Sequence, residues 1–339
     1  MDPITHAISG ALLATSAAPR QHSRAAALIG AIAGMAPDLD VFIRSAQDPL
    51  LNIEYHRHFS HALAFTPIGA LLVTLPFFLL FRRRLSFGWI YLFCFLGYIQ
   101  GGLIDAATSY GTQLWWPFAD TRVAWNIVAI IDPLYTLPLL VLLMIAVIKK
   151  QPRWAWVGIA WGLLYLAMGV VQRDRAEAAI TTLAHERGHT PTKLTVKPSV
   201  FNNILFRGIY RDSDTYYVDA VRINWLGEVV IYPGDSTPAI DLEVLLASLP
   251  EDSRLHRDLQ RFNHFSDGYL HHDPVRAGVI GDLRYALIPN TINALWGITP
   301  DFEDPDAPTP FDTFREVTPE KRAAFLMQLR GTYPSVENP

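Results

Sequence analysis

Four long stretches of this chain carry no charged side chain, and this restricts the fold more than any other feature. Residues 62–81 and 85–104 each run for 20 positions without a formal charge, and residues 154–172 for 19. Residues 133–148 add a stretch of 16, preceded by the apolar run 127–131. Because about 20 helical residues cross the hydrocarbon core of a bilayer, the pattern predicts four membrane-spanning helices.

The charged residues are distributed unevenly along the chain. Residues 1–171 contain 19 of the 60 Asp, Glu, Lys and Arg residues, and residues 172–339 contain the rest. Only 18% of the whole chain is charged, against about 25% in soluble proteins. We therefore expect a polytopic α-helical membrane domain over 1–171 and a soluble α+β domain over 172–339. The membrane domain is expected to carry the candidate metal site described below.

Two shorter apolar segments, residues 4–19 and 25–36, precede the long stretches. They predict a short N-terminal helical hairpin, which either spans the membrane or is half inserted and covered by protein. A cleaved signal peptide is disfavoured, because no basic residue precedes the apolar stretch and the second residue is Asp2.

The basic residues predict the orientation. Three alternate connections hold eight of them, namely Arg20, Arg24, Arg82, Arg83, Arg84, Lys149, Lys150 and Arg153, and the opposite connections hold Arg44, Arg57 and Arg122. The positive-inside rule places the eight in the cytoplasm. The opposite loops and the C-terminal domain are then expected to face outward.

Histidines and aspartates gather at the predicted outward ends of the apolar segments. They are His6, Asp38, Asp40, His56, His58, His61, Asp105 and Asp132. Imidazole and carboxylate are ligands of zinc- and manganese-class ions, and ionisable groups next to the hydrocarbon indicate a functional site. Together they predict a metal site at one membrane face.

Some of these residues have simpler interpretations. Asp38 and Asp40 could end a helix in a solvated loop. Asp132 precedes Pro133 and could begin a helix, where a carboxylate complements the helix dipole. His58 is expected at the surface. Asp105 is the hardest to explain in this way, because it follows 20 uncharged residues.

Other chemistry has no sequence support. The chain has no glycine-rich phosphate loop, no nucleophile elbow and no long basic block, so a nucleic-acid partner is not expected. The single Cys94 excludes a disulfide framework. The pairs Gly30/Gly34 and Gly97/Gly101 predict close helix–helix packing.

Several motifs give the chain a resemblance to a known family. These are Asp2–His6, Pro37–Asp40, His56–His61, Thr108–Gln113 and Ile131–Thr136. In them the sequence resembles the YdjM-like family of bacterial inner-membrane, predicted metal-dependent hydrolases. The resemblance implies a multi-pass protein of the inner membrane, and with the orientation predicted from the basic residues the C-terminal domain is expected in the periplasm. The resemblance also implies a divalent metal, zinc or alternatively manganese, held by His6, Asp38, His56, His61 and Asp105.

One position departs from the family pattern. Members usually place a histidine four residues before the aspartate of the third motif, and here that position is Gly101. Residues four apart share a helix face and can hold one metal. Either the site binds metal with fewer protein ligands, or it has lost the metal.

These observations give two function hypotheses. In the first, the protein is a metal-dependent hydrolase that attacks an ester or phosphoester, with lipid-linked compounds among the candidate substrates and membrane lipid as its partner. Asp40 would be the general base or would orient a histidine, and Arg57 would neutralise a phosphate. In the second, the protein is a non-catalytic scaffold or receptor whose soluble domain binds a protein partner; a transporter is a weaker third idea.

The C-terminal half predicts a mixed domain. A polar helix should continue the last span over 172–189, and a last helix should begin at Thr318. Strands are predicted at 192–197, 204–210, 215–223 and 228–232 as an antiparallel meander, with helices at 240–249 and 252–263 and a loop over 300–312. His271 and His272 are expected at the surface, and His185 with His189 at a solvated helix end.

Overall fold

The computed structural model describes residues 1–332, which form two compact units. The helical unit comprises Met1–Ile43, Tyr55–Val170 and Val200–Asn202. The sheet unit comprises Arg44–Glu54, Val171–Ser199 and the chain from Asn203 onward. Each unit is built from more than one segment of the chain, so neither corresponds to a single cut in the sequence.

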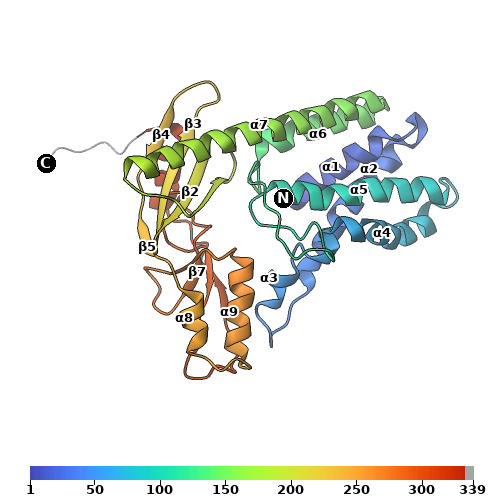
Figure 1. The fold of residues 1–339 in the computed structure, drawn as a ribbon. Helices are drawn as coiled ribbons and strands as arrows, with labels where there is room; N and C mark the ends of the chain where they lie inside the picture. The colour runs from blue at the N-terminus through green and yellow to red at the C-terminus, as the bar shows by residue number, and fades with distance from the viewer. Residues whose placement is uncertain (333–339) are drawn as a thin grey trace. The chain divides into compact units, whose positions relative to one another are not determined.

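Antiparallel helices packed side by side make up the helical unit (Figure 1). They are α1 (Pro3–Ser16), α2 (Ser23–Met35), α4 (Thr66–Phe81), α5 (Phe87–Ala107), α6 (Pro133–Lys149) and the first part of α7 (Pro152–Glu186). Short 3₁₀ turns at Ala36–Phe42 and Phe59–His61 carry the polar motifs. The apolar side chains of the helices form the core, and others face outward over α4, α6 and α7, as in a membrane protein.

Within the described residues, four helical stretches are long and apolar enough to cross a bilayer. They are Arg20–Phe42, Leu63–Phe81, Phe87–Ala107 and Pro152–Glu186. The set differs from the expected one in two places: the segment around 25–36 is extended by its flanking 3₁₀ turns, whereas α6 is a shorter apolar helix of 17 residues. The run 127–131 does not lengthen α6, because its backbone is irregular, with bends at residues 128, 130 and 131, and the Ile127 amide donates to the Ala107 carbonyl.

Glycines allow three helices to approach closely below the polar motifs. A Cβ on Gly10 would lie 2.4 Å from the Gly30 carbonyl oxygen, and one on Gly97 would lie 2.5 Å from the same atom. A Cβ on Gly34 would lie 2.5 Å from the carbonyl of His6. The predicted packing role of these glycines is confirmed. It brings α1, α2 and α5, and with them His6, together.

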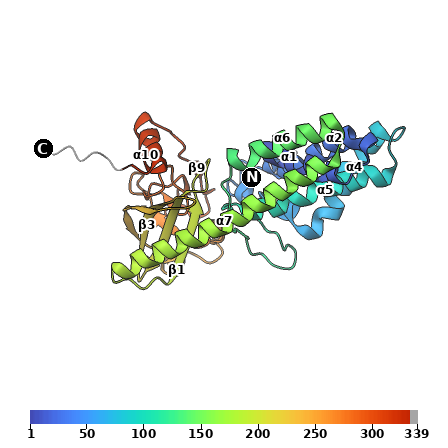
Figure 2. The same cartoon turned by 90° about the horizontal axis from the view of Figure 1, so that it is seen from above.

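The sheet unit begins with the second part of α7, which continues without a break from the apolar part (Figures 1 and 2). Its Ala176, Ile180 and Ala184 are buried against an antiparallel sheet. The sheet has the order β1 (Lys193–Pro198), β2 (Leu205–Asp212), β3 (Thr215–Ile223), β4 (Val229–Tyr232), and β5 (Ser236–Pro238) pairs with β3. The predicted meander and the continuing helix are confirmed.

A second antiparallel sheet was not predicted. It has the order β6 (Leu270–His272), β7 (Ile280–Asp282), β8 (Trp296–Ile298), β9 (Phe311–Thr313). Helices α8 (Leu242–Ala247), α9 (Arg254–Phe265) and α10 (Pro319–Arg330) complete the unit, and a short helix α3 (Leu51–Tyr55) lies at the end of the segment inserted from the N-terminal half. Strand β9 begins inside the predicted loop 300–312, which corrects that boundary.

His271 on β6 is fully buried, which overturns its expected place at the surface; its neighbour His272 is exposed. Adjacent residues of a strand point to opposite faces, so the two cannot share an environment. Neither ring nitrogen of His271 forms a hydrogen bond with the described residues. Burial, and then the nearby Arg207, lower the pKa of His271 to about 4, against the opposing effect of Asp273 and Asp282.

This burial predicts acid sensitivity of the sheet unit. The unfolded chain protonates His271 near pH 6.5 but the folded chain only near pH 4, so stability is retained above 6.5 and lost as the pH falls between these values. We expect the His271 contribution to lower the free energy of unfolding by about 2 kcal/mol between pH 7 and pH 5. The difference between wild type and His271→Leu in unfolding titrations at the two pH values measures it; an identical pH dependence in both would contradict it.

Candidate metal centre

His6 reaches the site from the first turn of α1. Asp2 caps this helix by accepting a hydrogen bond from the Thr5 amide at 3.0 Å, and Pro3 occupies the first helical position, where its missing N–H costs nothing. The cap fixes where the helix begins. It thereby places His6 one turn in, with only 1% of its surface exposed.

Two aspartates reach the site from the 3₁₀ turn that follows α2. Pro37 is buried at the start of this turn, and Asp38 and Asp40 follow it. The Asp38 side chain is 19% exposed and the Asp40 side chain 1%. The two carboxylates therefore end the helical run, as the simpler interpretation had it, but they are not in a solvated loop.

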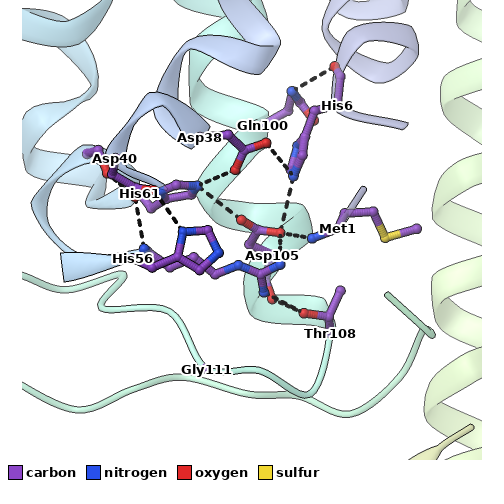
Figure 3. A network of polar contacts seen from close by, with 12 residues as sticks. Met1, His6, Asp38, Asp40, His56, His61, Gln100, Asp105, Thr108 and Gly111 are labelled. Carbon is purple, nitrogen blue, oxygen red and sulfur yellow. Dashed lines mark hydrogen bonds and ion pairs between the residues drawn. The ribbon is translucent and has the colours of Figure 1, made fainter. Parts of the chain in front are cut away.

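Asp105 and His61 complete a group of four side chains from four segments of the chain (Figure 3). His6 Nε2 lies 3.2 Å from Asp105 Oδ1 and 4.0 Å from Asp38 Oδ2. His61 Nε2 lies 3.1 Å from Asp105 Oδ2 and 3.3 Å from Asp38 Oδ1. Each carboxylate thus lies between the same two imidazoles, and Asp105 is fully buried.

Asp40 lies next to this group and binds residues 56–61, which we call the histidine loop. Its Oδ1 lies 2.8 Å from His56 Nδ1, and its Oδ2 lies 3.1 Å from His61 Nδ1. The same Oδ2 accepts the Ser60 hydroxyl at 2.7 Å. Asp40 therefore orients the ring of His61 so that Nε2 faces Asp38 and Asp105, the arrangement that carboxylates give to metal-ligating histidines.

The two histidines of the loop differ in their protonation. Burial opposes the charged form of His61, yet the hydrogen bonds with Asp105, Asp38 and Asp40 raise its pKa to about 10. Burial lowers the pKa of His56, although Asp40 works in the opposite direction. Positive charge is therefore favoured between the carboxylates where His61 Nε2 lies, and disfavoured at His56.

Arg57 lies beside the group with its backbone in the left-handed region, at φ 61°. Its amide donates to Asp40 Oδ2 at 2.9 Å, and its carbonyl accepts from the Gln113 amide at 2.9 Å. Its guanidinium contacts Asp105 at 3.1 Å and donates to Thr108 Oγ1 at 2.9 Å. A non-glycine residue held in this conformation by its surroundings is typical of functional sites.

The structure separates the remaining predicted residues from the four-residue group. His56 contacts Asp40 rather than Asp38 or Asp105. Asp132 caps α6 through the Leu134 amide and accepts the Tyr165 hydroxyl at 2.7 Å, so its helix-start interpretation is confirmed. His58 packs its ring against Tyr55 and Trp116 and lies outside the group.

Gly101 faces α2 rather than an open ligand position. A Cβ there would lie 3.1 Å from Pro37 Cγ, a contact tighter than most side chains make. A histidine at this position would require Pro37, next to Asp38, to move. The departure from the family pattern is thus accompanied by close packing of Gly101 on Pro37.

Three polar residues of the site were not predicted. Ser60 bridges Asp40 and His61, Thr108 holds Arg57, and Gln100 donates to the His6 carbonyl at 3.2 Å. The Met1 amino group also contacts Asp105. Ser60 lies within the His56–His61 motif, so its position in the motif was a usable signal. Gln100, in the middle of an apolar stretch, was another.

The donor set suits a divalent ion. A ligand atom from each of His6, Asp38 and Asp105 lies within 4.8 Å of the other two, and His61 Nε2 lies next to both carboxylates. Asp38 Oδ2 is buried and accepts no hydrogen bond from residues 1–332. Mixed nitrogen and oxygen donors around an unsatisfied carboxylate are what zinc and manganese bind.

One comparison with known proteins found a match, and it covers the two longer segments of the helical unit. The family model described as YdjM inner membrane protein matches residues 1–176, slightly more than half of the chain. No curated protein and no solved structure matches the chain. The match covers the apolar helices and every residue of the site. The chain therefore belongs to the YdjM inner membrane protein family.

Proposed function

We propose that this membrane protein is a metal-dependent hydrolase that acts on an ester or phosphoester. The observation that carries the proposal is the buried group of two imidazoles and two carboxylates, with a third carboxylate orienting one of the imidazoles. Ionisable groups buried at the end of apolar helices are costly unless they have a function. Perturbed titration at His61 also points to a functional site.

In this proposal each residue has a separate task. His6, His61, Asp38 and Asp105 would hold the ion, which when bound lowers the pKa of a coordinated water and polarises the scissile ester. Asp40 keeps His61 in the tautomer that presents Nε2 to the site, since Nδ1 faces the Asp40 carboxylate. This geometry favours an orienting role for Asp40 over that of general base.

Arg57 would supply a positive charge beside the reacting groups, since its guanidinium contacts Asp105 at 3.1 Å. Its Nη2 is engaged by Asp105, and its buried Nε forms no hydrogen bond within residues 1–332. A guanidinium in this place would stabilise the negative charge that develops on a phosphoryl or acyl oxygen. Asp105 would then have two tasks, as ligand and as the residue that positions Arg57.

The proposed substrate class is a lipid or a lipid-linked compound on the outward side of the inner membrane. The basic connections support this orientation, which also places the C-terminal region in the periplasm. A membrane-impermeant maleimide applied to intact cells carrying Ser213→Cys would test it, because Ser213 lies in the β2–β3 turn of the sheet unit. Turnover of soluble esters, with none of lipids or lipid-linked compounds, would contradict the substrate class.

Metal content is the first test of the site. We expect detergent-purified wild type to retain about one zinc or manganese ion per chain. His61→Ala should retain roughly a tenth of that or less, because Nε2 contacts both carboxylates of the group. His58→Ala is the matched control, as a histidine of the same loop whose ring contacts Tyr55 and Trp116.

The result is read from elemental analysis together with melting temperatures with and without chelator. Loss of metal in His61→Ala and retention in His58→Ala, with a chelator-sensitive wild type, would support the site. A wild type that binds no added zinc or manganese and melts identically with chelator would contradict it.

The alternative function is a non-catalytic membrane scaffold or receptor whose C-terminal region binds a protein partner. Gly101 in place of the usual family histidine favours it, because the close contact with Pro37 leaves little space for that ligand. It predicts partner binding that is insensitive to chelator and to His61→Ala.

A further inference from the structure

The β3–β4 hairpin has an apolar tip. The turn after β3 contains Trp225 and Leu226, and β4 begins with Val229. Leu226 is fully exposed at 102%, while Trp225 and Val229 are 37% and 44% exposed. Large apolar side chains at the end of a hairpin have no role in the core of the sheet unit. Their exposure indicates contact with something outside this unit.

Hydrogen bonds with α7 position this hairpin tip next to the residues where the apolar part of α7 ends. Gln172 ends the uncharged run 154–172 and donates to the Ile223 carbonyl at 3.1 Å. One turn later, Arg175 donates to the carbonyls of Asn224 at 2.9 Å and Gly227 at 3.1 Å. The hairpin tip is thus bound to α7 within about 6 Å, along the helix axis, of the last apolar residues.

The apolar surface of α7 leads directly to this level. Leu163, Leu164, Val170 and Val171 are exposed on the helix, and the charged residues begin at Arg173. The boundary between hydrocarbon and water on α7 therefore falls between Val171 and Arg175. Trp225 and Leu226 are held at that boundary by Arg175, on the same helix that crosses the membrane.

The other end of the same sheet is polar. Strand β3 has nine residues and extends for about 30 Å, and at its far end the β2–β3 turn is Asp212–Asp214. This turn is held by the segment that follows α7, where the Thr190 amide donates to Asp212 at 2.8 Å. The two hairpin tips of β3 thus differ in polarity as expected if only one of them contacts lipid.

We propose that the tip of the β3–β4 hairpin, Trp225 and Leu226, inserts into the headgroup region of the bilayer that α7 crosses. Tryptophan and exposed aliphatic side chains are typical of this region, where one part of the side chain is dry and the other wet. The proposal does not depend on metal binding or on hydrolysis. It assigns the sheet unit a second membrane contact in addition to the helix that anchors it.

Site-directed spin labelling of the full chain tests the proposal. Leu226→Cys and Ser213→Cys each receive a nitroxide, and the native Cys94 is fully buried and should stay unlabelled, which labelled wild type verifies. The proteins are placed in nanodiscs of phosphatidylethanolamine and phosphatidylglycerol. Collision rates with oxygen report lipid, and those with a water-soluble nickel chelate report water. Melting temperatures of both variants verify that each is folded.

We expect the oxygen-to-nickel collision ratio to be severalfold higher at position 226 than at position 213. Nickel-dominated collisions at 226 would place the tip in water and overturn the proposal. Weak collisions with both reagents at 226 would also overturn it, because they would mean that protein covers the tip. An equally high oxygen ratio at 213 would overturn the argument from the polarity of the two hairpin tips.

Discussion

In chelator-treated protein, Asp105→Ala is expected to lower the free energy of unfolding by about 3–5 kcal/mol. Asp105 is fully buried, and its carboxylate contacts Arg57 at 3.1 Å as well as the imidazoles of His6 and His61. Without Asp105, the buried guanidinium of Arg57 has no charge partner. The free energy lost by leaving a buried charge unpaired is larger than the net stabilisation that the intact pair provides. Because chelator treatment precedes the measurement, the loss reports the contacts of Asp105 with Arg57 and the two imidazoles, and not a bound ion.

A double-mutant cycle makes this result specific. Arg57→Met removes the guanidinium, and Asp105→Ala combined with Arg57→Met should recover about 1–3 kcal/mol relative to the sum of the single variants. Unfolding by sodium dodecyl sulfate in mixed micelles, followed by circular dichroism, provides the free energies. Asp120→Ala, which removes an exposed carboxylate, should change stability by less than about 0.5 kcal/mol. Strict additivity in the cycle would mean that Asp105 and Arg57 are not energetically coupled.

Replacing Arg207 is expected to have a comparable effect in the sheet unit. This buried side chain on β2 donates to the carbonyls of Leu283, Pro289 and Thr291, with shortest distances of 2.7 Å to each. Arg207→Met leaves two buried carbonyls and the partly buried carbonyl of Thr291 without this donor, at about 1–3 kcal/mol each before relaxation, so we expect a loss of about 4 kcal/mol.

The lysine variant separates charge from geometry. Arg207→Lys keeps the positive charge but cannot reach three carbonyls with one compact ammonium group, and it should lose nearly as much stability as Arg207→Met. Hydrogen exchange of residues 283–291 should rise in both variants. Arg211→Met, further along the same strand, removes contacts with Ser213 and Asp214 at the surface and should cost less than about 1 kcal/mol. Full stability in Arg207→Lys would show that charge alone suffices.

Much of the fold could be predicted from local signals. The caps of α10 are an example, because Thr318, Pro319 and Gly331 each have a specific conformational reason for their place. The meander was also predictable, since β3 is flanked by turn residues. The second sheet was not, because strands of three residues show no alternation and their pairing depends on contacts distant in sequence.

The site was predictable in part for the same physical reason. Asp105 was conspicuous because a carboxylate at the end of an apolar stretch needs a compensating environment. The different contacts of His56 and His61 were not predictable. Both histidines contact Asp40, but only the three-dimensional position of the turns shows that His61 also contacts Asp38 and Asp105. Nor could the packing of Gly101 on Pro37 be deduced from spacing.

The division of the chain into units has a consequence for where this protein can be shortened. The sheet unit takes residues 44–54 from between the motifs of Asp40 and His56, and within that unit Arg261 of α9 contacts Asp48 and Glu54 of this insertion. It also takes its central helix from the second part of α7. A fragment that begins after α7 would lack the α7 side chains that pack against the first sheet. A deletion that ends the chain at residue 176, where the family match ends, would leave residues 44–54 without α9, which binds them. Neither unit is released by a single cut, so we expect a chain shortened at either place to be less stable than the full chain.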